Sequence, residues 1–234
     1  MKPNRIAPNA SPRHAGPPLL LPALIYAGLM IAGASTLNAA FQIPHDSAAA
    51  AAAYLARLDR SLSWGSFCEF ASAVPLAIFV ATVVSRLHFL RVRAAGATIA
   101  LAGGILAAGM LLLSGLALWS LTRPGIAAAD GAVRTLQAVG FAGGGPGFVV
   151  ALGLFLAGVS VTAGLHRLVP RWIMFFGLAV ALGCELASLT LVLSIASWCI
   201  PFGRFLSIVW MIALAICLPS RLPADTAAPL SVSA

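Results

Sequence analysis

The sequence predicts an all-α integral membrane protein, built as a bundle of six transmembrane helices. Hydrophobic residues make up 61% of the 234 residues and charged residues only 9%, whereas a soluble domain carries about 25% charged residues. The mean hydropathy of +1.00 points the same way. The apolar residues gather in runs long enough to cross a bilayer, which takes about 20 helical residues. These observations exclude a soluble globular domain.

The first segment, residues 1–18, is rich in proline and polar side chains and carries Lys2, Arg5 and Arg13, a composition typical of a disordered basic tail. The apolar run that starts at Leu19 is longer than the roughly 7–15 residues of a signal-peptide core, so we interpret it as the first span. A flexible, proline-containing tail is expected over residues 219–234. The six expected spans cover about 19–41, 63–85, 94–121, 146–165, 172–198 and 202–218.

Two connecting segments carry patterns of their own. After Pro44, the side chains of Tyr54, Leu58 and Leu62 share one helical stripe, which is typical of a short helix lying on the membrane surface. A polar loop is an equally open alternative. The glycine-rich run at residues 143–147 does not follow a strand and lacks the lysine of a phosphate-binding loop. It therefore predicts a turn into the fourth span.

The positions of the arginines predict the orientation. The two short loops at residues 86–93 and 166–171 hold five arginines between them, and short basic loops stay in the cytoplasm. This places the N-terminus and the C-terminus inside, so that both tails are cytoplasmic. The net charge of +8 then reflects membrane orientation, and nucleic acid is not expected as a partner.

Several kinds of chemistry have no pattern to support them. The histidines fall in tails, loops or span ends, whereas a transmembrane haem needs axial ligands inside the spans. The four cysteines lack zinc-site spacing, although a disulfide between Cys68 and Cys199 is left open. No Ser-His-Asp set and no H-E-x-x-H motif occurs in a span. We therefore expect no catalytic residues, no metal and no cofactor.

The chain's only glutamates, Glu69 and Glu185, lie in two near-copies of one pentapeptide, CEFAS and CELAS, inside apolar runs. A carboxylate inside a membrane is costly and needs a partner or water. Both glutamates share a helical face with small residues, so we expect both to face neighbouring helices. Glu69, near the outer end of its span, is expected to meet Arg204, or else Arg123 or Arg134. Glu185, near the middle of the fifth span, has no basic residue at its depth, so its neutral form is favoured.

The pentapeptides fall in the second and the fifth span, which are equivalent positions in a three-plus-three duplication. Three spans per half would make such halves inverted, as in many transporters. The expected depths of the two glutamates disagree with this interpretation, so it remains an alternative.

Two stretches, SLSWGSFCEFASAV and LVPRWIMFFGLAV, together with the six spans, resemble an uncharacterised bacterial family of integral membrane proteins, a domain of unknown function. The resemblance covers about residues 19–218, and its most specific part is the turn that contains Pro170 and Arg171. It implies a six-helix architecture in the bacterial inner membrane, with an acid at the position of Glu69 but none matching Glu185. It implies no activity.

The sequence therefore favours a structural or accessory membrane protein that is not an enzyme and whose environment is the lipid bilayer, with a protein partner or a second copy left open. The alternative is a small proton-coupled transporter that uses the intramembrane acids. An enzyme acting on lipid would need a nucleophile or a metal site, and none is evident. The candidate functional residues are Glu69, Glu185 and Arg204.

Overall fold

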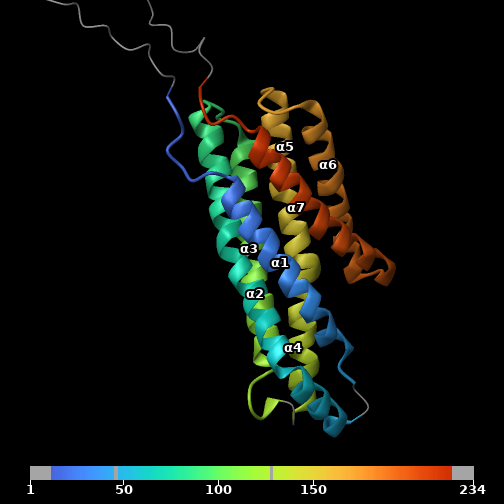
Figure 1. Ribbon diagram of the computed structural model, residues 1–234. Coiled ribbons are helices and arrows are strands. Elements are labelled where there is room, and N and C mark those ends of the chain that lie inside the picture. The colour runs from blue at the N-terminus through green and yellow to red at the C-terminus, as the bar shows by residue number, and fades with distance from the viewer. Residues whose placement is uncertain (1–11, 45–46, 127–128, 223–234) are drawn as a thin grey trace, which may run out of the picture.

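The computed structural model describes residues 12–44, 47–126 and 129–222. In this part of the chain the regular structure is helical, and the helices form one elongated bundle (Figure 1). Six of these helices are long and apolar enough to cross a membrane, which confirms the all-helical fold and the predicted number of helices able to span. The spans run over Leu20–Gln42, Ala49–Phe89, Ala95–Ser120, Gly131–Leu165, Arg171–Leu191 and Ser194–Cys217.

The two ends of the described chain meet at one end of the bundle, which we call the terminal end. Arg13 and Arg221 form an antiparallel bridge there, and His14 lies 3.0 Å from the Ser85 hydroxyl. Burial and the guanidinium of Arg86 lower the pKa of His14, so the neutral imidazole is favoured in this position. The opposite end, which we call the distal end, carries two connections (Figure 1). One joins α1 (Leu20–Leu37) to α2 (Ala48–Phe89), and the other joins α3 (Ala95–Ser120) to α4 (Asp130–Ala142). The outer parts of the two predicted tails lie outside the described residues.

The second span differs from the prediction. Neither a separate surface helix nor a polar loop precedes it, because α2 (Ala48–Phe89) is one continuous helix of 42 residues. Ser47 caps its start by accepting a hydrogen bond from the Ala50 N–H at 3.1 Å. Nothing between this cap and Pro75 breaks a helix, and Leu55 and Leu62 are buried. At 1.5 Å per residue α2 is about 63 Å long, roughly twice the apolar thickness of a bilayer.

The fourth span also starts earlier than predicted. Instead of a loop up to residue 145, α4 (Asp130–Ala142) continues through η3 (Gly143–Gly147) into α5 (Phe148–Leu165). The glycine-rich run is a widened, π-helical turn with a local break at Gly145, where φ is −85° and ψ is −109°. A proline inside a helix leaves one carbonyl without its usual donor, and the wide turn accommodates Pro146 without ending the helix.

The fifth span is shorter than predicted. It comprises α6 (Arg171–Leu186) and η4 (Ala187–Leu191), and it ends at Leu191 instead of residue 198. The chain then turns back through η5 (Ser194–Trp198) into α7 (Cys199–Cys217). Glu185 consequently lies six residues from the end of its span, four residues past the middle. The α6–α7 hairpin reaches only partway toward the distal end (Figure 1).

Two apolar clusters form the interior. The larger fills the terminal half around Phe79, Phe155 and Trp210, whose rings meet edge to face at 6.2 Å and 6.0 Å. The smaller lies at the distal end, where α1 (Leu20–Leu37) and η1 (Asn38–Gln42) meet α2, α3 (Ala95–Ser120) and α4. Glycines bring the central helices together: a Cβ on Gly103 would lie 2.7 Å from the Phe155 nitrogen, so only glycine permits this approach.

Candidate functional site

Buried polar side chains gather between the terminal and distal halves of the bundle, where the two apolar clusters meet. Ser66, Glu69 and Ser72 on α2 and Ser114 on α3 are all buried. Burying a polar group without a partner is costly, so a polar layer at this level needs an explanation beyond packing. A cavity of about 540 Å³ provides one. Its walls come from α1, η1, α2, α3, α4, η3 and α7, and include Leu37, Phe41, Glu69, Ser114, Phe141, Gly144, Ile200, Arg204 and Phe205.

The predicted proximity of Glu69 and Arg204 is confirmed in this cavity. The Arg204 Nη2 atom lies 3.8 Å from the Glu69 Oε1 atom and donates a hydrogen bond to the carbonyl oxygen of Gly144. The Arg204 guanidinium also lies 5.5 Å from the centre of the Phe148 ring. Arg123 instead lies over Trp119 at 4.2 Å. Arg204 is therefore the residue that balances the charge of Glu69.

This charge pair leaves hydrogen-bonding capacity unused. A direct charged N–H···O bond is about 2.7–2.9 Å long, so the 3.8 Å separation is ionic contact without a hydrogen bond. Within the described chain, the Glu69 Oε2 atom and the Arg204 Nε atom are buried and have no hydrogen-bond partner. Only 3% of the Glu69 surface is exposed. One unpaired acceptor and one unpaired donor therefore belong to the two charged residues that line the cavity.

The glycine-rich turn makes this arrangement possible. A Cβ on Gly144 would lie 2.5 Å from the Ser114 hydroxyl oxygen and 2.7 Å from Glu69 Oε1. A side chain at residue 144 would thus displace the carboxylate or the hydroxyl. Ser114 itself donates to the Gly140 carbonyl at 2.9 Å. Gly144 is therefore a wall of the site as well as part of a bend, a role that the sequence analysis missed. Three adjacent glycines inside an apolar run were the signal.

Glu185 lies elsewhere: its side chain lies beside a neighbouring helix, α5, as predicted, but it is exposed in a surface groove instead of being enclosed in the bundle. The structure leaves it exposed on α6, while the preceding Cys184 is buried. The reason is packing at Cys184: a Cβ on Gly153 or on Gly203 would lie 2.7 Å from its side chain, so α5 and α7 close over the cysteine. Glu185 instead borders a surface groove that also includes Pro146 and Gly147. The two acids thus lie on different sides of η3.

The structure adds little support for other site chemistry. Among the described residues, no three His, Cys, Asp or Glu side chains come close enough to hold a metal ion. Cys68 and Cys199 are free thiols, so the disulfide that the sequence left open is not formed. The site that remains is a charged cavity with mainly apolar walls.

Comparisons with known proteins found no match to a family model, to a curated protein or to a solved structure. The family resemblance therefore stays a prediction.

Proposed function

We propose that this protein binds a small amphipathic molecule in the cavity beside Glu69 and Arg204, and that it serves as an accessory protein of the membrane. The proposal is carried by Glu69 and Arg204, which line the cavity and whose Oε2 and Nε atoms are buried without a hydrogen-bond partner. A ligand with a polar group would satisfy these atoms, and its apolar part would contact Phe41, Phe141 and Phe205. Ligand sites commonly combine apolar walls with a few convergent polar groups.

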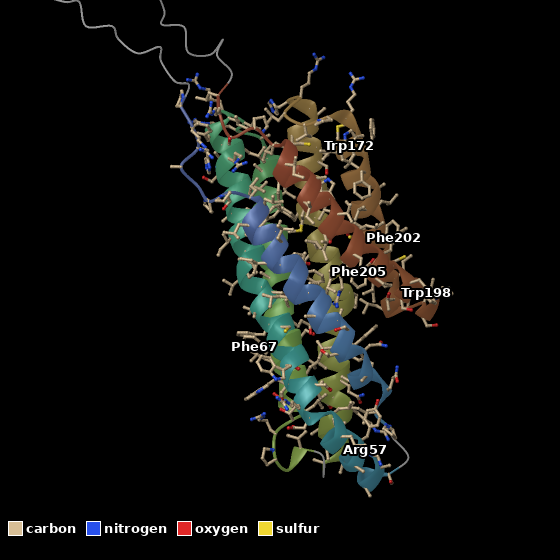
Figure 2. The ribbon with its side chains drawn as sticks, viewed as in Figure 1. Arg57, Phe67, Trp172, Trp198, Phe202 and Phe205 are labelled. Atoms are coloured by element: carbon tan, nitrogen blue, oxygen red, sulfur yellow. The ribbon has the colours of Figure 1, made fainter. Side chains whose placement is uncertain are left out.

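The proposal includes a position in the membrane. Trp172 lies toward the terminal end, whereas Trp198 lies at the tip of the α6–α7 hairpin and Phe67 at a roughly similar level on α2 (Figure 2). All three are exposed, as expected of aromatic residues at the two membrane interfaces. From Phe67 to the end of α2 is about 33 Å, close to the roughly 30 Å of a bilayer core. Arg57 lies well beyond Phe67 (Figure 2).

In this placement the terminal end is cytoplasmic, the distal end projects from the outer face and the cavity opens near the outer boundary. Reporter fusions test the orientation. Fusions after Ala50 and after Gly125 should report outside, while fusions after Leu90 and at the C-terminus should report inside. A C-terminal reporter that reads outside would reverse the placement.

Binding is favoured over transport because the terminal half of the bundle is closed. On the cytoplasmic side of Glu69, the buried residues of α2 are mainly apolar, such as Leu76, Phe79 and Val83. The buried polar ones are Ser72, Thr82 and, near the end of the helix, Arg86. The Phe79, Phe155 and Trp210 rings fill the space beyond them. The cavity is thus accessible from one side of the proposed membrane, as a receptor or accessory site requires.

One observation favours the second candidate, a small proton-coupled transporter. Transporters often bind substrates where a spanning helix is interrupted, and η3 interrupts the fourth span between the two glutamates. Transport would require the Phe79, Phe155 and Trp210 rings to move apart. Proton-driven uptake into vesicles that is lost in both Glu69→Gln and Glu185→Gln, with normal assembly, would establish this candidate.

Cavity-filling variants test the binding proposal. Ala34 lines the cavity, whereas Ala32 is exposed on another face of the same helix. The purified protein, released from mild detergent in a mass spectrometer, should retain a small molecule of discrete mass. Ala34→Phe should lose it and Ala32→Phe should keep it. Equal retention by both variants, or no bound molecule in the unsubstituted protein, would contradict binding in this cavity.

A further inference from the structure

A groove on the surface of the bundle has no role in the proposed ligand site. The groove, of about 400 Å³, runs along α5, between α3 and α6. Its floor contains small residues, Ala142, Gly147 and Ala151, at spacings that place them on one face of the continuous α4–α5 helix. Small residues on one face let the backbone of another helix approach closely within a bilayer. The groove therefore has the shape of a helix-docking site.

The rim of the groove is apolar and exposed. Leu106 on α3, Leu154 on α5 and Leu191 at the end of η4 all line it, with 52%, 40% and 76% of their surfaces exposed. In the proposed placement these side chains face lipid. Lipid tails would cover all three leucines, so these side chains alone do not indicate a protein partner.

Glu185 also lines the groove, and lipid tails offer no partner for its charge. Its side chain lies against α5, where a Cβ on Gly153 would be 3.0 Å from the Oε1 atom. Ser188 donates only to the backbone carbonyl of Glu185, at 2.6 Å. Within the described chain the carboxylate has no ion pair and no hydrogen bond. An acid in this position is costly, and a positive charge from outside the chain would offset the cost.

We propose that the groove is the docking site for a transmembrane helix of another protein, and that this helix carries one arginine or lysine at the depth of Glu185. Charge complementarity selects this occupant. A second copy of the chain does not supply the charge through α7, because Arg204, which follows Gly203 on that helix, is already engaged by Glu69 and Gly144. Two copies meeting through this groove would bring Glu185 against a like charge.

This interaction is independent of the proposed ligand site. The groove uses Ala142, Pro146 and Gly147 of the glycine-rich region, whereas the cavity uses Gly144 and Gly145. A partner helix in the groove would leave the cavity open. The result of the docking experiment therefore does not decide whether the cavity binds a ligand.

Photo-crosslinking in native membranes tests the docking site. A benzophenone amino acid at Leu154, on the groove rim, should give one discrete crosslinked product. The matched probe at Leu24, which is 50% exposed on α1, should not give that product. Mass spectrometry of the product should identify a transmembrane segment with an internal arginine or lysine. Glu185→Lys should abolish the product, and replacing the partner's basic residue with glutamate should restore it.

Three outcomes would overturn the proposal. The first is a product with twice the mass of the chain, which would identify a second copy. The second is an absence of any protein product from the probe at Leu154, which would leave lipid as the occupant. The third is a product that Glu185→Lys leaves unchanged, or one whose partner segment lacks a basic residue.

Discussion

The two glutamate pentapeptides have the same local structure and opposite surroundings. In each, the serine donates to the backbone carbonyl of the glutamate at 2.6 Å, from Ser72 to Glu69 and from Ser188 to Glu185. In α2 the glutamate is buried and the preceding Cys68 is half-buried. In α6 the cysteine is fully buried and the glutamate is exposed. A rotation of one residue about the helix axis, about 100°, separates the two arrangements.

Glycines on the neighbouring helices produce this difference. Gly144 leaves room for the carboxylate of Glu69, whereas Gly153 and Gly203 leave room for the thiol of Cys184. Arg204 then supplies the positive charge on the side of Glu69. The space left by neighbouring helices therefore decides whether an acid in an apolar span is internal or exposed, and its own sequence context does not.

The largest expected effect is the loss of the basic partner. Arg204→Met would leave the Glu69 carboxylate buried without a positive charge, and breaking a buried pair in this way costs about 3–5 kcal/mol. We expect a clear fall in the melting temperature of the detergent-solubilised protein. Size-exclusion chromatography of samples heated to a series of temperatures measures this fall. Arg123→Met is the control, because Arg123 is exposed. If both variants lose the same stability, Glu69 does not depend on Arg204.

Filling the space beside Glu69 should have the next largest effect. Gly144→Val would place a side chain within 2.7 Å of the carboxylate oxygen, and overpacking of this kind costs about 1–3 kcal/mol. The same heating assay measures it. Gly109→Val is the matched control, because a Cβ on Gly109 meets nothing within 4 Å. A Gly144→Val variant as stable as the Gly109→Val variant would show that the carboxylate can move aside freely.

Much of the fold could be predicted because it follows from apolar runs and charges. Six spans emerged from segment length and hydropathy, and the Glu69–Arg204 contact emerged because both residues lie at similar depth in spans with few charges. Their pairing required no knowledge of which helices touch, since a buried acid has few partners to choose from.

The other features of the fold and the site depend on contacts between helices, which a single sequence does not reveal. The length of α2 and the continuity of α4 with α5 result from the apolar cluster at the distal end, around Leu55 and Val133, which stabilises both helices beyond the length that a bilayer requires. The exposure of Glu185 on α6 was not predicted, because small residues flank it on both sides. Only the glycines of α5 and α7 decide which of Cys184 and Glu185 is enclosed.

Because the acid is buried in one pentapeptide and the thiol in the other, we predict that Cys68 and Cys184 react at different rates. In two variants that each retain a single cysteine, Cys68 should react with a small thiol reagent in detergent about tenfold faster than Cys184 or more. The reason is that Cys184 is fully buried and reacts only after local opening. In SDS the two rates should converge, which controls for intrinsic reactivity. Faster reaction of Cys184 in the folded protein would contradict the assigned face of α6.

The smallest effect is expected at the second glutamate, and it tests the comparison most directly. Glu185→Gln keeps the shape of an exposed side chain that has no ion pair in the described chain, so the purified protein should stay within about 0.5 kcal/mol of the unsubstituted stability. Glu69→Gln removes the charge opposite Arg204 from a buried site and should cost about 1–3 kcal/mol. The two substitutions are chemically identical and occur in near-identical pentapeptides. Any difference between their melting temperatures therefore reports the surroundings alone. Equal losses of stability would mean that Glu185 is as enclosed as Glu69, and the proposed open groove beside it would have to be abandoned.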